Sequence, residues 1–103
     1  MIIVNTEEIQ GKKISETIGI ARGSTVRARN LGRDIFAGLK NLVGGEISEY
    51  TKLLADAREE ALGRMILDAN RMGADAIVNV RFTTSTVMQG CSEILAYGTA
   101  VKF

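Results

Sequence analysis

The sequence predicts a single α+β domain over residues 1–103, in which a small, mostly antiparallel sheet is covered by one long helix. Three observations lead to this fold class. Apolar residues recur at steps of three and four over about 46–72, which is the period of a helix. On both sides of that stretch, apolar and polar residues alternate, which is the period of a strand. The length fits one domain with a thin core.

The N-terminal part of the chain predicts two strands. The apolar run at 2–4 is a short buried strand, and the segment 13–29 alternates isoleucines with small or polar residues. Gly19 and Ala21 leave one face of the second strand nearly bare, so a helix or another backbone must pack closely there. Gly23 predicts a kink or a bulge in the same strand.

A short helix is expected next, at about 31–42. Its leucines and isoleucine have helical spacing, but Gly32 and Gly38 weaken it, so its stability depends on packing. The pair Gly44 and Gly45 ends this helix.

The long helix at about 46–72 is the most strongly patterned element. Glu60 precedes Arg64 by four residues, the favourable orientation for a surface ion pair. Met65 and Met72 fall on its apolar stripe, so we interpret both as core residues rather than metal ligands.

Two strands close the domain as a hairpin, at 74–87 and 92–103, joined by a Gln-Gly link. Alternation in the first strand puts Val78 and Val80 on one face and Asn79 on the other. The predicted order of elements is therefore β-β-α-α-β-β.

One face of this sheet needs a second cover. The alternation predicts that the face away from the helix carries small residues, namely Ala21, Ala96, Gly98 and Ala100, and polar residues such as Asn79 and Thr83. Small residues and unpaired edge strands favour contact with another subunit, so we expect a homo-oligomer.

Composition excludes several function classes. Thirteen basic and twelve acidic residues give a net charge of +1, without the basic surplus of a nucleic-acid binder, so we expect no nucleic-acid partner. The N-terminus lacks a signal-peptide pattern, and no apolar run approaches the roughly 20 residues that span a bilayer. A single cysteine fits a reducing compartment. We expect a cytoplasmic protein with no membrane partner.

The chain also contains no histidine, the commonest general base and a common zinc ligand. A histidine-dependent serine or cysteine hydrolase is therefore excluded within this chain. No constellation of carboxylate, lysine or tyrosine side chains replaces it. We therefore expect a protein that is not an enzyme.

Three segments occur together in one order, NLVGGEISEYTKLLADAREEALGRM, GADAIVNVRF and SEILAYGTAVKF. Together they resemble the YbjQ-like family of small bacterial and archaeal proteins. The resemblance covers nearly the whole chain and implies a dodecin-like subunit fold. It also implies a homopentameric ring, single or stacked, in which the subunit sheets join around an axis. The family carries a heavy-metal-binding label, and some families of this fold bind flavins.

The first candidate site lies in the stretch STVMQGCSEI, which holds Cys91 and, three residues earlier, Met88. Soft metals bind thiolates and thioethers, but two ligands on one chain cannot close a tetrahedral site. Cys91 and Met88 are therefore metal candidates only if oligomerisation brings copies together. The alternative is a hairpin link with two adaptable residues.

The second candidate is the loop NLVGGE, in which Asn41, Gly44, Gly45 and Glu46 are the expected ligand or interface residues. Free backbone N–H groups before a helix can hold an anion. The alternative is a tight turn between two helices.

The function we expect is that of a homo-oligomeric, pentameric binding protein for a soft or heavy metal or a small ligand. The alternative is a scaffold ring with no ligand of its own. The cofactor is left open by the sequence, with a heavy metal favoured over a flavin.

Overall fold

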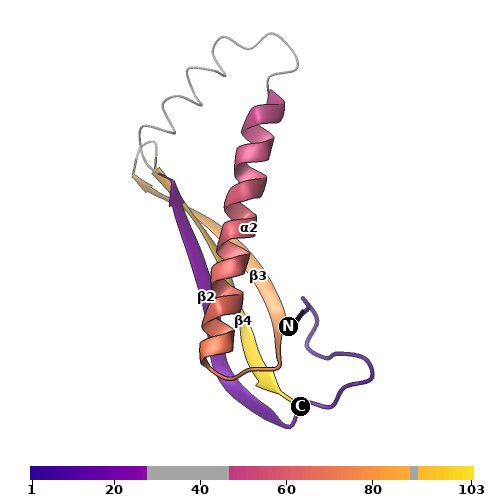
Figure 1. The fold of residues 1–103 in the computed structure, drawn as a ribbon. Coiled ribbons are helices and arrows are strands. Elements are labelled where there is room, and N and C mark those ends of the chain that lie inside the picture. The colour runs from indigo at the N-terminus through magenta and orange to yellow at the C-terminus, as the bar shows by residue number, and fades with distance from the viewer. Residues whose placement is uncertain (28–46, 89–90) are drawn as a thin grey trace.

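A computed structural model describes residues 1–27, 47–88 and 91–103. These ranges form four strands and one helix, arranged as in Figure 1: β1 (Ile2–Ile3), β2 (Glu16–Arg27), α2 (Ile47–Arg71), β3 (Ala76–Met88) and β4 (Cys91–Lys102). The α+β class is confirmed. The described elements run β-β-α-β-β rather than in the predicted order, because the short helix expected at 31–42 lies outside the described residues.

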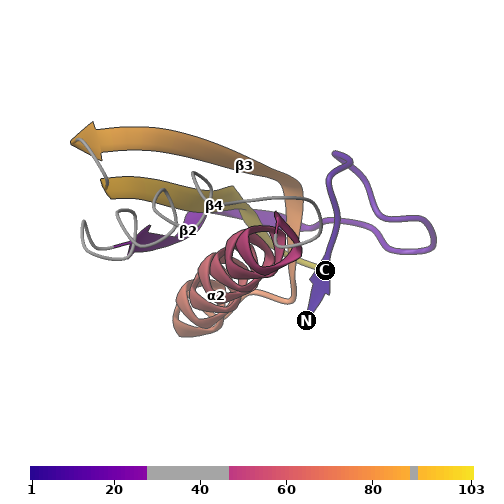
Figure 2. The same ribbon diagram turned by 90° about the horizontal axis from the view of Figure 1, so that it is seen from above.

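The strands form one mixed sheet in the order β1-β3-β4-β2. Strand β4 pairs antiparallel with both β2 and β3, whereas the two residues of β1 pair parallel with β3. The sheet is therefore mostly antiparallel, as the sequence predicts. Figure 2 shows α2 on one side of this sheet, nearer to β2 and β4 than to β3.

The helix rests on small residues. The core between helix and sheet is formed by α2 and by the strands. The helix contributes Ala57, Ala61, Met65 and Ala69, and the strands contribute Ala21, Ile77, Ile94, Ala96 and Ala100. The small residues of the strands thus face α2, which corrects the prediction that they form the uncovered side of the sheet. The physical reason is that alanine on both surfaces lets the helix approach the strands closely. Met65 is fully buried, and Met72 packs against this cluster, so both are core residues as expected.

The closest approach is at Gly23. A Cβ added there would lie 2.5 Å from the Ala61 carbonyl oxygen and 2.6 Å from the Arg64 carbonyl carbon, and would overlap the Met65 backbone nitrogen. The register of β2 with β4 is continuous through Gly23, and the irregularity lies between Thr17 and Gly19. The predicted kink at Gly23 is therefore wrong, and helix contact explains this glycine instead.

A bulge in β3 corrects a second prediction. Val78 pairs with Thr99 and Arg81 with Tyr97, so three steps on β3 match two on β4. Asn79 has a φ of 54°, a left-handed conformation that asparagine tolerates better than most residues. As a result Val80 packs against the helix-side core, whereas Val78 does not.

Val78 belongs to a second, smaller core. Val78 packs with Ala76 and Val101. The partly buried side chains of Val4, Ile9 and Ile14 cover this cluster. The segment between β1 and β2 therefore covers part of the sheet face that α2 leaves open, where β3 begins and β4 ends.

The contact at Gly23 gives a direct stability test. We expect Gly23→Ala to lower the free energy of unfolding by about 1–3 kcal/mol, because backbone atoms must move apart. Gly63→Ala is the matched control, since a Cβ at this exposed helix position meets nothing within 4 Å. It should raise stability by about 0.5–1 kcal/mol through helix propensity. Urea unfolding at one protein concentration measures both. Equal stability of Gly23→Ala and the wild type would contradict the packing.

Candidate functional site

The tip of the β3–β4 hairpin holds the two sulfur-bearing candidates. Met88 is the last residue of β3, Cys91 is the first residue of β4, and their Cα atoms are partners in the antiparallel register. The hairpin is confirmed, but both residues belong to its strands rather than to the link between 74–87 and 92–103, where the sequence predicted them. Their role in binding a metal stays a prediction.

The other predicted site, formed by Asn41, Gly44, Gly45 and Glu46, lies outside the described residues. In the ranges that the structure describes, no three His, Cys, Asp or Glu side chains gather as a metal site would require. No helix in the same ranges has the length and apolar character needed to cross a membrane.

The sheet face away from α2 exposes apolar side chains among polar ones. Side chains alternate along a strand, so Ile20 and Val26 of β2 lie on the face opposite to Ala21, and Tyr97 of β4 lies opposite to Ala96. Their exposed fractions are 67%, 55% and 37%. We call the surface formed by Ile20, Val26 and Tyr97 the open face.

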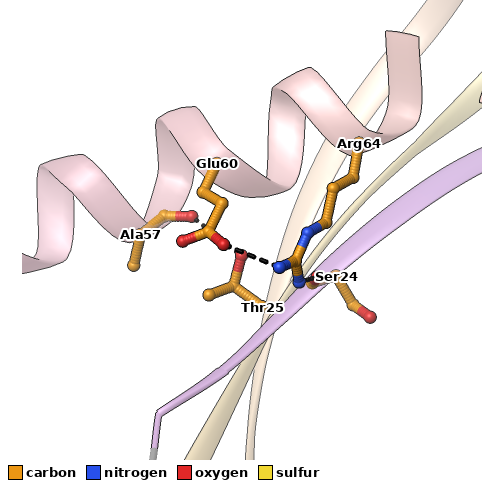
Figure 3. A network of polar contacts seen from close by, with 5 residues as sticks. All are labelled: Ser24, Thr25, Ala57, Glu60 and Arg64. Atoms are coloured by element: carbon orange, nitrogen blue, oxygen red, sulfur yellow. Dashed lines mark hydrogen bonds and ion pairs between the residues drawn. The ribbon is translucent and has the colours of Figure 1, made fainter. Parts of the chain in front are cut away.

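The outer edge of β2 is covered by polar side chains of α2. The backbone N–H of Arg22 donates to Oδ2 of Asp68 at 3.0 Å. The backbone oxygen of Ser24 accepts a hydrogen bond from Nη1 of Arg64 at 2.5 Å. Nη2 of Arg64 lies 2.7 Å from Oε1 of Glu60, which confirms the predicted ion pair (Figure 3). Backbone groups that an edge strand normally leaves unpaired are therefore bonded to the helix.

Thr25 adds a buried contact to the same network. Its side-chain oxygen, Oγ1, donates to the backbone oxygen of Ala57 at 3.3 Å, and Thr25 is only 3% exposed (Figure 3). Thr25 is the one polar residue buried in the described core. An unpaired hydroxyl there would destabilise the fold, and this hydrogen bond gives the hydroxyl a partner.

These contacts border a cleft of about 590 Å³ between β2 and α2, lined by Arg22, Gly23, Ser24, Arg64, Leu67, Arg71 and Leu95. We call it the arginine cleft. The sequence did not reveal it, because Arg22 is far along the chain from Arg64 and Arg71. One signal was available: Arg64 and Arg71 are seven residues apart, which places them on one helix face two turns apart.

A second hollow of about 430 Å³ lies on the other flank of α2. It is lined by Ile3, Val4, Asn5, Leu62, Val80, Arg81 and Phe82. Arg81 closes part of it by donating from Nη1 to the backbone oxygen of Asn5 at 2.8 Å. Phe82 is 48% exposed.

The chain is similar to a known protein family along its whole length. The model of the YbjQ family, described as "Putative heavy-metal-binding", matches residues 1–103. A UPF0145 protein of Methanosarcina acetivorans is 62% identical over 102 residues, which are 99% of this chain and 96% of that protein. A UPF0145 protein of Photobacterium profundum is 60% identical over 102 residues, with 99% of both chains covered.

A solved structure shares the fold. The crystal structure of a Pediococcus pentosaceus protein with unknown function, from the DUF74 family, matches with a TM-score of 0.66 and 16% sequence identity. The match covers 100% of this chain and 97% of that one. At this identity the likeness shows a common fold and nothing about ligands.

The edge contacts of β2 predict a local stability effect. Asp68→Ala removes the acceptor for the Arg22 amide, so we expect the free energy of unfolding to fall by about 0.5–1.5 kcal/mol. Hydrogen exchange at the Arg22 amide should accelerate. Asp68→Asn keeps a side-chain oxygen as acceptor and should retain most of the protection. Unchanged exchange in Asp68→Ala would show that this hydrogen bond does not protect the edge.

Proposed function

The chain belongs to the YbjQ family, and on this premise we propose that it is a homo-oligomeric binding protein that holds a soft metal ion between subunits. The family's description supplies the ligand class. The assembly we propose is a homopentameric ring of dodecin-like subunits, which the resemblance of the sequence implies. The function is one of binding rather than catalysis.

The observation that carries the proposal is the register of the hairpin tip. Met88 and Cys91 are opposite each other, so each subunit offers one thioether and one thiol residue at a single place in its sheet. A thiolate and a thioether are the donors that soft metals select. Because a four-coordinate site needs more than these two donors, the proposal requires hairpin tips from at least two subunits.

The open face supports self-association. Ile20, Val26 and Tyr97 expose apolar surface on the neighbouring strands β2 and β4. Burial of such a patch stabilises an assembly by roughly 25 cal/mol per Å² of apolar area. A second copy of the chain is the occupant we propose, since symmetric homo-oligomers are the commonest assemblies.

The alternative is a scaffold ring without a metal. The same open face favours it, since self-association there needs no sulfur ligand. The two functions therefore differ in what occupies the hairpin tips, and two separate experiments distinguish them.

The first experiment tests the metal. Protein purified without chelator should carry a soft metal at a fixed ratio to the oligomer, measured by native mass spectrometry and elemental analysis. Cys91→Ser should lower metal affinity at least about tenfold, because loss of even an outer partner of a metal ligand costs 10–100-fold. Met72→Leu, which removes a core sulfur, is the control and should leave the metal in place. Full metal content in Cys91→Ser would refute the thiolate site, and wild-type protein that carries no metal would favour the scaffold ring.

The second experiment tests the assembly. Ile20→Lys on the open face should shift the particle to a smaller mass in light scattering, because an unpaired charge would be buried at the contact. Leu54→Lys introduces the same charge at a residue of α2 that is 40% exposed and should leave the mass unchanged. A wild-type mass for Ile20→Lys would exclude the open face as the subunit contact.

A further inference from the structure

Three guanidinium groups from two elements line the arginine cleft. Arg22 comes from β2, and Arg64 and Arg71 come from α2. Two helical turns separate Arg64 from Arg71, which is about 10 Å along the axis. Arg22 is held beside the intervening turn, because its backbone N–H donates to Asp68 at 3.0 Å. All three cations are therefore carried by regular secondary structure, without any loop.

The cleft has an excess of positive charge. The lining described above contains three cations and no carboxylate. Glu60 and Asp68 flank it, and each is engaged, Glu60 with Arg64 and Asp68 with the Arg22 amide. With both counted, three positive and two negative charges leave a local net charge of +1.

Hydrogen-bond donors remain available in the cleft. The two bonds described for Arg64 go to Ser24 and Glu60, and a guanidinium has five N–H donors. Within the described ranges, the side chains of Arg22 and Arg71 make no hydrogen bond or ion pair, and both residues are exposed. Arg64 thus holds its position on the protein, while Arg22 and Arg71 keep their donors for a ligand.

The chemistry of these donors selects a phosphoryl group. Guanidinium matches phosphate oxygens with two parallel hydrogen bonds, and several cations suit a group with more than one negative charge. Leu67, which is 55% exposed, and Leu95 add apolar surface to the same cleft. The cleft has a volume of about 590 Å³ and is open to solvent.

We propose that the arginine cleft binds a small phosphorylated molecule, with its phosphoryl group on Arg22, Arg64 and Arg71 and its apolar part against Leu67 and Leu95. This site uses neither Cys91 nor Met88. Its failure would leave the proposed metal function intact, and the absence of a metal would leave this site intact.

Calorimetric titration of the intact oligomer tests the ligand class with three probes at physiological ionic strength. Phenyl phosphate should bind, inorganic phosphate should bind about tenfold more weakly, and phenol should not bind, because only the first engages both cations and leucines. Leu67→Ala should weaken phenyl phosphate and leave inorganic phosphate unchanged. No binding of either phosphate at millimolar concentration would overturn the proposal.

Charge-matched variants test the residues. Arg22→Gln and Arg71→Gln should each weaken phenyl phosphate about tenfold, whereas Arg58→Gln, an exposed arginine of α2 outside the cleft, should not. Equal weakening by Arg58→Gln would show diffuse attraction by net charge and overturn the proposal. Dissociation of the oligomer by Arg71→Gln, with no phosphate binding in the wild type, would show instead that the cleft meets acidic residues of a second copy.

Discussion

Helix α2 lies so close to β2 that Gly23 has no room for a side chain beside the backbone of Ala61 and Met65. This approach depends on small residues on both surfaces, with Ala57, Ala61 and Ala69 on the helix fully buried or nearly so. A larger residue at any of these positions would lift the helix and open a void, which costs free energy in a core this thin. The depth of the helix then decides what its flanking side chains can reach.

The covered edge of β2 is the first consequence. Asp68 and Arg64 reach the strand because the helix axis is close, and they bond the amide of Arg22 and the carbonyl of Ser24. An edge strand with free backbone groups invites pairing with another chain. At these two residues the helix occupies that position, so assembly by strand addition is blocked there. Apolar side chains on the open face are therefore the better basis for self-association than the β2 backbone.

Sequence periodicity predicted the elements because each one is local. The apolar periodicity of the long helix, the second strand and the hairpin can be read from residues close together in the sequence. The hairpin is enough to bring Met88 opposite Cys91. Alternation also showed which small residues share a face, but it could not show that α2 covers that face, since coverage is a long-range contact. The bulge at Asn79 was missed because Ala76, Val78, Val80 and Phe82 keep alternating through it in the sequence. The arginine cleft was missed because β2 and α2 lie far apart in the sequence.

Arg22 connects the two surfaces of functional interest. It alternates with Ala21 and Gly23, so it starts from the open face beside Tyr97, yet it lines the arginine cleft at the strand edge. Burial of the open face against another subunit would remove water from this guanidinium, and an unpaired buried cation is costly. An anion in the cleft would offset that cost by giving Arg22 a partner. Occupation of the cleft and assembly through the open face should therefore be thermodynamically coupled, with each favouring the other by the same factor.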